Sequence, residues 1–434
     1  MDCNFEQKNF IDYLDKNIIN DNITNLYPIF ITGSAGSGKS YLLRCIINKF
    51  KDYNINPDIA AFTAIVSKSI GGRTIHSLFK FDFFGKCLKP NVSLLKNMKV
   101  LIIDEISMVS AKYLDSINDM LMKYKKNTNV FGGVFVIVFG DLYQLEPISN
   151  DENEELPVYK SIVWQNFLKY QLYENMRQNE KEFINALNMI RIGKLDSLDY
   201  FNNIYKKSKS NNLEEKEIYS TTIVSTNDEA YIINTRIFDK IKQNNSEIYY
   251  LNNANYKTKY INYDPDVYDY SYDKNNINKI FPNIYICKGT KIMITANCVE
   301  NSCKNSDMGY IDNIVIDEDK NIKYIILNMI DGYKKYLYKS SITFRNKRKD
   351  KILSMRGFPI TYAWAITCHK SQGSTIDNLI IKSNNTFAKG QLYVALSRVK
   401  LSDNLILLNA ITEKDVLCND DVNQLYSTMK NLII

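Results

Sequence analysis

A glycine-rich segment near the start of the chain constrains its fold more than any other feature. Residues 33–40 read Gly-Ser-Ala-Gly-Ser-Gly-Lys-Ser, which fits the pattern G-x-x-x-x-G-K-[ST]. The segment follows a short apolar run at 27–31 and precedes a helix-length amphipathic stretch at 41–50. A strand, this loop and a helix predict a phosphate site, because the glycines let backbone N–H groups face an anion at the helix N-terminus. The alternative, a glycine-rich turn that happens to contain lysine, does not account for the flanking strand and helix.

Two carboxylates at the end of another apolar run complete the pattern of a nucleotide site. Residues 100–103 are Val-Leu-Ile-Ile, typical of a buried parallel strand, and Asp104 and Glu105 follow directly. Lys39 is expected to bridge the β- and γ-phosphates, while Ser40 and Asp104 hold Mg²⁺. Glu105 is placed to orient and deprotonate a water molecule as a general base. These residues predict chemistry on a nucleoside triphosphate, either hydrolysis or the reaction of a nucleotide kinase.

The composition narrows the chemistry further. The 434 residues include only two histidines, and the eight cysteines contain no Cys-x-x-Cys pair. These facts argue against zinc catalysis, a dithiol redox site and a Ser-His-Asp hydrolase. No apolar run approaches the ~18 residues of a membrane span, and the first residues lack the basic and apolar pattern of a signal peptide. We therefore expect a soluble intracellular protein, and its net charge of +7 permits a nucleic-acid partner.

The apolar runs along the chain predict an α/β fold. Runs at 59–62, 100–103 and 134–139 alternate with helical stretches, which is the pattern of a mostly parallel sheet. Between 284 and 341 the chain alternates apolar and polar residues in short stretches, which indicates a small all-β insertion. Apolar α/β character returns at 361–367.

Three further motifs carry polar groups suited to phosphate chemistry. Gln144 lies in Gly-Asp-Leu-Tyr-Gln, directly after the run at 134–139, and is a candidate sensor of a γ-phosphate. Arg177 lies in Asn-Met-Arg-Gln, and Arg398 lies in Ala-Leu-Ser-Arg. Hydrolysis needs mobile positive charge on the transferred phosphoryl group, and an arginine delivered by a closing domain supplies it. Both arginines are candidates for that role.

In these motifs the chain resembles the superfamily 1B DNA helicases, which move 5′ to 3′, and is most similar to the PIF-type helicases, with the RecD-like helicases next. The matching stretches are GSAGSGKS, AFTAIVSKSIGGRTIHSLF, LIIDEISMVS, FGGVFVIVFGDLYQLEPI, LYENMRQ, FPITYAWAITCHKSQGSTID and QLYVALSRV. They span nearly the whole chain, and the match is poorest between 200 and 280. The resemblance implies an α/β fold of two RecA-like P-loop domains with parallel sheets. It also implies a small pin or wedge insertion in the first domain and an SH3-like β-barrel insertion in the second.

The resemblance also implies where these parts lie. The first RecA-like, ATP-binding domain would comprise residues 1–180, with 79–96 as the pin or wedge. The second domain would begin with 181–280, which includes a variable Asn- and Tyr-rich segment. The SH3-like insertion would comprise 281–350, and the remainder of the second domain would comprise 351–434. Within the pin, Phe83 and Phe84 are the candidates for the tip that splits the duplex. Phe79 and Phe81 fit the period-two pattern of core residues instead.

Site residues follow from the resemblance motif by motif. The ATP-binding residues are Gln7, which would read adenine, Gly33, Ser34, Ala35, Gly36, Ser37, Gly38, Lys39, Ser40 and Gly373. The catalytic residues are Lys39, Asp104, Glu105, Gln144, Arg177 and Arg398, with the two arginines as arginine fingers and with Ser40 and Asp104 as the Mg²⁺ ligands. The residues that line the DNA track are Thr63, Thr74, His76, His369, Lys370 and Ser371. For His76 a capping or core position is the alternative, and for His369 a buried linker.

Together these motifs predict an ATP-dependent, DNA-stimulated helicase that uses ATP and Mg²⁺, translocates 5′ to 3′ on single-stranded DNA and unwinds duplex. The expected partners are single-stranded DNA and tailed or forked duplex, bound by a monomeric motor at sites of DNA replication, repair or recombination. One alternative is a translocase subunit of a recombination complex that does not unwind alone. The other is a nucleic-acid-binding scaffold that does not hydrolyse ATP, whose mark would be a broken set of catalytic residues. That set is intact here.

Overall fold

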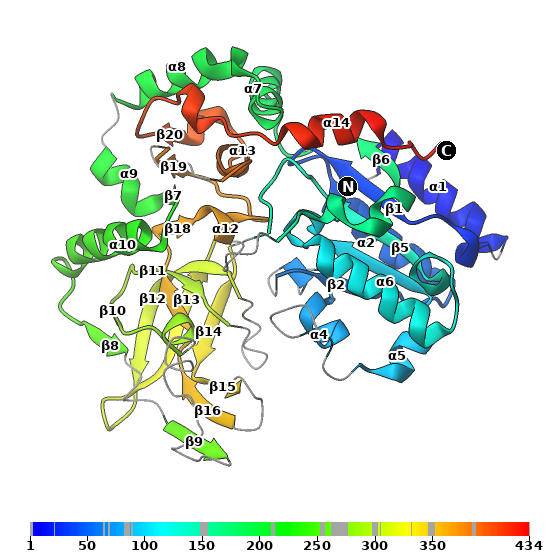
Figure 1. The fold of residues 1–434 in the computed structure, drawn as a ribbon. Coiled ribbons are helices and arrows are strands. Elements are labelled where there is room, and N and C mark those ends of the chain that lie inside the picture. Colours follow the sequence, from blue (N-terminus) through cyan, green and yellow to red (C-terminus); the bar gives the residue numbers. More distant parts are fainter. Residues whose placement is uncertain are drawn as a thin grey trace. The chain divides into compact units, whose positions relative to one another are not determined.

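The computed structural model of the chain, drawn in Figure 1, forms two compact units. Unit 1 comprises Met1–Asn211 and Ser371–Ile434, and unit 2 comprises Asn212–Lys370. The structure describes residues 3–20, 22–63, 66–67, 70–81, 87, 90–147, 155–209, 213–251, 257–261, 277–296, 303, 305–330, 332–345, 352–383 and 388–433.

A six-stranded sheet with parallel pairing lies at the centre of unit 1. In the order β3-β2-β4-β5-β1-β6 its strands are β3 (Arg73–Thr74), β2 (Asp58–Ala61), β4 (Val100–Asp104), β5 (Phe135–Gly140), β1 (Ile29–Gly33) and β6 (Leu168–Leu172). Thr32 lies beside Gly140, and Ala61 lies beside Asp104. The carboxyl ends of β1, β4 and β5 therefore meet at one edge. The predicted α/β class with a parallel sheet is confirmed.

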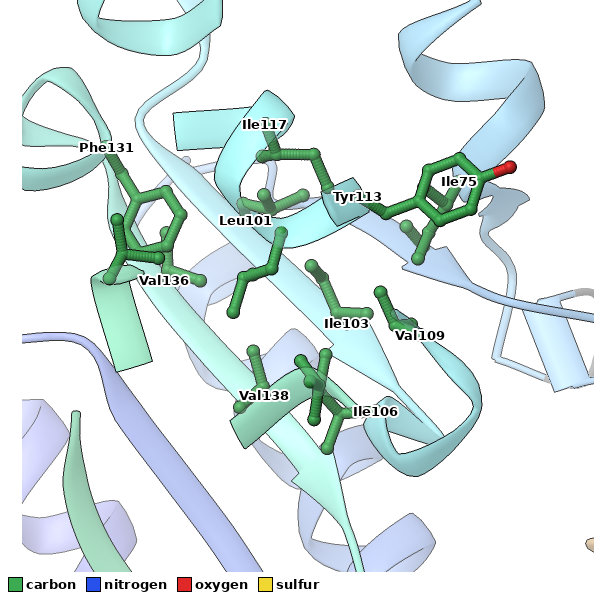
Figure 2. Packing of buried hydrophobic residues seen from close by; sticks show 14 of the residues in the cluster. Ile75, Leu101, Ile103, Ile106, Val109, Tyr113, Ile117, Phe131, Val136 and Val138 are labelled. Carbon is green, nitrogen blue, oxygen red and sulfur yellow. The ribbon is translucent and has the colours of Figure 1, made fainter. Parts of the chain in front are cut away.

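Helices cover both faces of this sheet. On one face lie α1 (Phe5–Ile19) and α2 (Lys39–Asp52), and on the other lie α4 (Ile75–Phe79), α5 (Val92–Asn97) and α6 (Ala111–Lys125). In β4, Leu101 and Ile103 point toward Ile117 of α6, as Figure 2 shows, whereas Ile102 joins the core beneath α1 and α2. Successive strand residues point to opposite faces. A strand covered on both faces is buried at every position, and this explains the unbroken apolar runs in the sequence.

The remainder of unit 1 is built from elements late in the chain together with the segment after β6. Its helices and strands are α7 (Lys181–Arg191), α8 (Leu198–Ser208), β19 (Leu379–Ile381), α13 (Gln391–Leu396), β20 (Leu405–Leu407) and α14 (Asp420–Thr428). Short 3-10 helices are η1 (Ile23–Asn25), η2 (Ile106–Met108), η3 (Val130–Gly133), η4 (Val158–Lys160), η5 (Ile162–Asn166), η6 (Leu195–Ser197), η9 (Ser402–Asn404) and η10 (Glu413–Asp415). Strands β19 and β20 pair in parallel. Helix α14 packs against the core of the six-stranded sheet through Val422.

Unit 2 combines a parallel strand pair with antiparallel sheets. Its elements are α9 (Leu213–Tyr219), β7 (Thr221–Val224), α10 (Asn227–Lys242), β8 (Tyr249–Leu251), β9 (Lys257–Ile261), β10 (Ile284–Ile286), β11 (Lys291–Ile294), β12 (Met308–Ile316), β13 (Ile322–Met329), β14 (Lys334–Tyr338), β15 (Ser340–Arg345), β16 (Ile352–Gly357), β17 (Ile360–Tyr362) and β18 (Ala365–Thr367), after which α12 (Cys368–Ser371) begins. Strands β7 and β18 are parallel, and a five-stranded antiparallel sheet has the order β14-β13-β12-β11-β17. The SH3-like type of this insertion and the predicted domain boundaries stay predictions.

The predicted pin at 79–96 falls only partly within the described residues. Phe79 and Phe81 are 1% and 4% exposed and stack on one another, so the expectation that they belong to the core is confirmed. Phe83 and Phe84 lie outside the described residues. No helix in the described part of the chain is both long enough and apolar enough to cross a membrane.

A buried lysine makes the stability of unit 2 dependent on pH. Lys291 is 2% exposed, and its Nζ donates to the Ser220 carbonyl and to Thr221 Oγ1, both at 2.8 Å. Burial lowers the pKa of Lys291 to about 7. Between that value and the unfolded pKa of ~10.4, the unfolded chain binds more protons than the folded chain, so stability rises with pH.

We therefore expect the thermal unfolding midpoint of the wild type to rise, relative to that of Lys291→Met, as pH increases from 7 to 10. Thermal melts of both proteins over this range measure the difference, in which the contributions of other titrating groups cancel. Parallel pH profiles of the two proteins would contradict the assignment.

Candidate active site

The phosphate loop lies where β1, β4 and β5 end. Gly38 precedes α2 in the left-handed conformation, with φ of 80°, and Gly36 is also left-handed, with φ of 87°. A Cβ atom added at Gly36 would lie 2.7 Å from the Cβ of Arg177. Both the backbone and the available space therefore require glycine at position 36. The Met176 N–H donates to the Gly36 carbonyl at 2.7 Å and holds the loop against the segment after β6.

The ammonium group of Lys39 turns back onto the loop. Its Nζ donates to the carbonyls of Gly33 at 2.7 Å and Ser34 at 2.9 Å. Burial lowers the pKa of Lys39, and the charges of Asp141 and Glu105 oppose that shift without cancelling it. An ammonium held mainly by neutral carbonyls favours the approach of an anion.

Two adjacent carboxylates face the loop from the end of β4. Asp104 is 5% exposed, and burial together with the neighbouring Glu105 raises the pKa of Asp104 to about 7. Glu105 has a φ of 51°, an unusual backbone conformation for a residue other than glycine, and its Oε2 accepts a hydrogen bond from Gln372 Nε2 at 3.1 Å. Carboxylates crowded in this way fit a divalent cation, because its charge favours their ionised forms. Asp104, through its carboxylate, and the exposed Ser40, through its hydroxyl, would hold Mg²⁺ here.

A cavity of about 210 Å³ gathers most of the predicted ATP-site residues. Ala35, Gly36, Gly38, Lys39, Ser40, Glu105, Gln144, Arg177, Gly373 and Arg398 line it, and Tyr41 and Met176, which the sequence analysis missed, complete the lining. The other predicted residues of this region do not line the cavity: Gly33, Ser34 and Ser37 belong to the phosphate loop, and Asp104 ends β4. A larger surface cavity of about 1000 Å³ near α7 and α8 contains none of the predicted residues. The chemistry therefore points to the smaller cavity.

Two arginines meet at this cavity. Arg177 Nη1 donates to the Ser397 carbonyl at 3.0 Å, while Arg398, 2% exposed, donates from Nε to the Val394 carbonyl at 2.7 Å. Burial, and next the positive charge of Arg398, lower the pKa of Arg177 to about 10. Two partly desolvated guanidinium groups that repel each other are suited to receive a phosphate, whose charge removes the repulsion.

Gln7 lies beside the loop at the start of α1. Asn4 Oδ1 accepts from the Gln7 N–H at 2.9 Å, and Gln7 Oε1 accepts from the Asn4 N–H at 3.1 Å, forming a capping box. Gln7 Nε2 donates to the Gly38 carbonyl at 3.4 Å. The structure thus brings the predicted adenine reader next to the phosphate loop, and its assignment to adenine stays a prediction.

The structure also reveals a buried charge pair that the sequence analysis did not assign. Asp141 is fully buried and receives hydrogen bonds from Arg191 Nε at 2.9 Å, from Arg191 Nη2 at 2.8 Å and from the Tyr393 hydroxyl at 3.2 Å. Burial acts to raise the pKa of Asp141, but Arg191 outweighs it, and the pKa lies below its ordinary value. Asp141 directly follows β5, and Asp104 is the last residue of β4, so the position of Asp141 at a strand end was a usable signal. Nothing in the sequence marks Arg191.

Three of the predicted DNA contacts lie close together in unit 1. Thr63 Oγ1 accepts from the Val66 N–H at 3.3 Å, and Thr74 caps α4. His76 Nε2 lies 2.9 Å from the Tyr113 hydroxyl. All three side chains thus have partners within unit 1, and His76 is half-buried. Their contact with DNA stays a prediction.

The other three predicted DNA contacts lie in the stretch that includes α12. His369 is half-buried, which lowers its pKa, and Lys370 is exposed; both belong to unit 2. Ser371 belongs to unit 1 and is fully buried, so its hydroxyl does not face solvent. Lys370 is therefore the most accessible candidate of the three, and their assignment to the DNA track also stays a prediction.

Comparison with known proteins places this site in context. Residues 2–201 match the family model described as PIF1-like helicase. The chain is 29% identical to the ATP-dependent DNA helicase Pif1 of Campylobacter jejuni, over 89% of this chain and 88% of that protein. It is 27% identical to the ATP-dependent DNA helicase PIF1 of Xenopus laevis, over 93% of this chain but only 62% of that longer protein.

Solved structures resemble the chain over almost its full length. The crystal structure of the Pif1 helicase from Candida albicans has a TM-score of 0.77 and 25% identity, and covers 98% of each chain. The Pif1 helicase from Bacteroides, solved in complex with ADP-AlF3 and ssDNA, has a TM-score of 0.72 and 28% identity, and covers 99% of this chain and 98% of that one.

Proposed function

We propose that this chain, a member of the PIF1-like helicases, hydrolyses ATP with Mg²⁺ and uses the energy to move 5′ to 3′ along single-stranded DNA and to unwind duplex. The observation that carries the proposal is that Lys39, Glu105, Gln144, Arg177 and Arg398 line the same cavity. It combines the phosphate-binding, water-activating and charge-stabilising groups that hydrolysis of ATP requires.

Each group has a defined task in this proposal. The loop N–H groups and Lys39 hold the β- and γ-phosphates, and the Lys39 ammonium exchanges its loop carbonyls for phosphate oxygens. Ser40 and Asp104 would hold Mg²⁺, which would supply positive charge to stabilise the phosphates. Glu105 accepts the proton of the attacking water, and Gln144 contacts the γ-phosphate. Gln372 keeps the Glu105 carboxylate oriented through its hydrogen bond.

Single-stranded DNA is the proposed track. The Pif1 helicase of Bacteroides was solved bound to ssDNA, and another solved structure describes unwinding at forked dsDNA by Pif1 helicases. The net charge of +7 suits a partner recognised through its phosphate backbone. We place the action of the protein at sites of DNA replication, repair or recombination, as a monomeric motor.

The decisive experiment measures ATP hydrolysis with and without single-stranded DNA, together with unwinding of 5′-tailed and 3′-tailed duplexes. We expect stimulation by single-stranded DNA and unwinding of the 5′-tailed duplex only. Stimulated hydrolysis without unwinding of either duplex would favour a translocase subunit that needs a partner. Absence of hydrolysis would favour a binding scaffold.

The predicted pin supplies a separate test of unwinding. Because Phe79 and Phe81 are core residues, Phe83 and Phe84 remain the candidates to stack on the last base pair. Base–aromatic stacking contributes ~1–3 kcal/mol per base. Replacing both Phe83 and Phe84 with Ala is expected to slow unwinding strongly while DNA-stimulated ATP hydrolysis stays near the wild-type rate. If unwinding, hydrolysis and thermal stability fall together, the segment belongs to the core and the pin lies elsewhere.

A further inference from the structure

A buried tyrosine connects the phosphate loop to α13, the helix that ends just before Arg398. Tyr393 lies on α13 and is 1% exposed. Its hydroxyl oxygen accepts a hydrogen bond from the Ala35 N–H at 2.7 Å, and the hydroxyl donates to Asp141 Oδ2 at 3.2 Å. A phenol has one proton to donate and lone pairs that accept, so both bonds form at once. Tyr393 does not line the ATP cavity, and thus acts on it only through its partners.

Asp141, which accepts the hydrogen bond from Tyr393, is also held by other groups. Arg191 donates to both oxygens of Asp141, and the Tyr143 N–H donates to Oδ1 at 3.3 Å. The guanidinium of Arg191 also lies 4.3 Å from the centre of the Tyr143 ring. These contacts occupy the Asp141 carboxylate, so Asp141 serves as an anchor that fixes the position of the Tyr393 hydroxyl.

The residues that follow Tyr393 contact the two arginines of the cavity, Arg177 and Arg398. Arg398 donates from Nε to the carbonyl of Val394, the residue next to Tyr393, and from Nη2 to Ser397 Oγ at 2.8 Å. Arg177 donates to the Ser397 carbonyl. Both guanidinium groups are therefore hydrogen-bonded to the segment from Tyr393 to Arg398, and we expect a displacement of Tyr393 relative to Ala35 to shift them.

We propose that Tyr393 is a positioning residue for ATP hydrolysis, one that keeps the Ala35 turn of the phosphate loop in register with Arg177 and Arg398. The inference rests on the proposed ATP hydrolysis. Replacing Tyr393 with Phe keeps the ring in the core and removes only the hydroxyl. The Ala35 N–H then lacks its acceptor, Asp141 loses one donor, and the register between loop and arginines is no longer fixed. Arginine fingers interact more strongly with the γ-phosphoryl group in the transition state than in bound ATP. Misplaced arginines should therefore lower kcat more than they lower nucleotide affinity.

The test compares Tyr393→Phe with a matched control, Tyr426→Phe. Tyr426 also uses its hydroxyl in two hydrogen bonds of unit 1, one shared with the Thr32 hydroxyl at 2.5 Å and one accepted from the Leu142 N–H at 3.4 Å, but in none with the loop at 34–38. For the wild type and both variants, kcat and KM for ATP, the affinity for a fluorescent ADP analogue and the thermal unfolding midpoint are measured.

For Tyr393→Phe we expect kcat to fall about tenfold to a hundredfold, with ADP affinity within about threefold of wild type. Tyr426→Phe should lose a similar amount of thermal stability while keeping its kcat. A kcat of Tyr393→Phe within about twofold of wild type, or equal losses of kcat in both variants, would overturn the inference. Wild-type hydrolysis that DNA does not stimulate would count against the proposed function alone, since the basal kcat still tests Tyr393. A wild type without any hydrolysis would overturn both.

Discussion

Replacing Glu105 with Gln is expected to lower the kcat of ATP hydrolysis by about 10²- to 10⁴-fold, the usual contribution of a general base. Glutamine matches glutamate in size and keeps an oxygen that can accept the 3.1 Å hydrogen bond from Gln372, but it does not take a proton from water. ATP affinity should stay near the wild-type value, because the phosphates are held by the loop and Lys39. Steady-state hydrolysis and equilibrium binding of a fluorescent ATP analogue measure the two quantities separately.

Two further variants, Glu182→Gln and Lys39→Ala, serve as comparisons for Glu105→Gln. Glu182→Gln makes the same chemical change at an exposed position on α7 and should leave hydrolysis unchanged. Lys39→Ala should abolish hydrolysis and, unlike Glu105→Gln, should also weaken ATP binding. The Lys39 ammonium is expected to contact the phosphates in the ground state as well as in the transition state. Full activity in Glu105→Gln would refute the general-base assignment.

Removing either Arg177 or Arg398 is expected to reduce kcat by about 10³-fold or more, as for arginine fingers that stabilise the transferred phosphoryl group. The reason lies in the geometry: both side chains line the ATP cavity, and the charge of Arg398 contributes to the lowered pKa of Arg177, so the pair is close enough to interact. Single-turnover hydrolysis by Arg177→Ala and Arg398→Ala measures the loss directly.

The matched control for the arginines is Arg44→Ala, on the exposed surface of α2, which follows the phosphate loop. It removes one positive charge without touching the cavity and should hydrolyse ATP normally. If Arg177→Ala or Arg398→Ala instead loses DNA binding while its DNA-free hydrolysis stays normal, that residue belongs to the DNA track.

The local parts of the ATP site were predictable because their geometry is encoded in a few consecutive residues. In the phosphate loop, glycine at positions 36 and 38 permits the positive φ that turns the backbone toward an anion, and Lys39 begins the helix immediately afterwards. The carboxylates of Asp104 and Glu105 were predictable from the four apolar residues before them, since parallel strands end at a common edge. The burial of Phe79 and Phe81 was also predicted from their period of two, although Phe79 ends helix α4 and does not lie in a strand.

Interactions between distant residues were not predictable in this way, because hydrogen bonds and packing between distant segments depend on tertiary structure that sequence spacing does not specify. Arg191 reaches Asp141 across 50 positions, and Tyr393 reaches the same carboxylate across 252. The raised pKa of Asp104 likewise depends on burial and on the neighbouring charge of Glu105 in the folded chain. The amino-acid sequence alone therefore indicated the candidate groups for the chemistry and the strand ends at which they lie. The contacts among Asp141, Arg191 and Tyr393 became visible only in the folded chain, because they depend on which distant side chains the fold buries together.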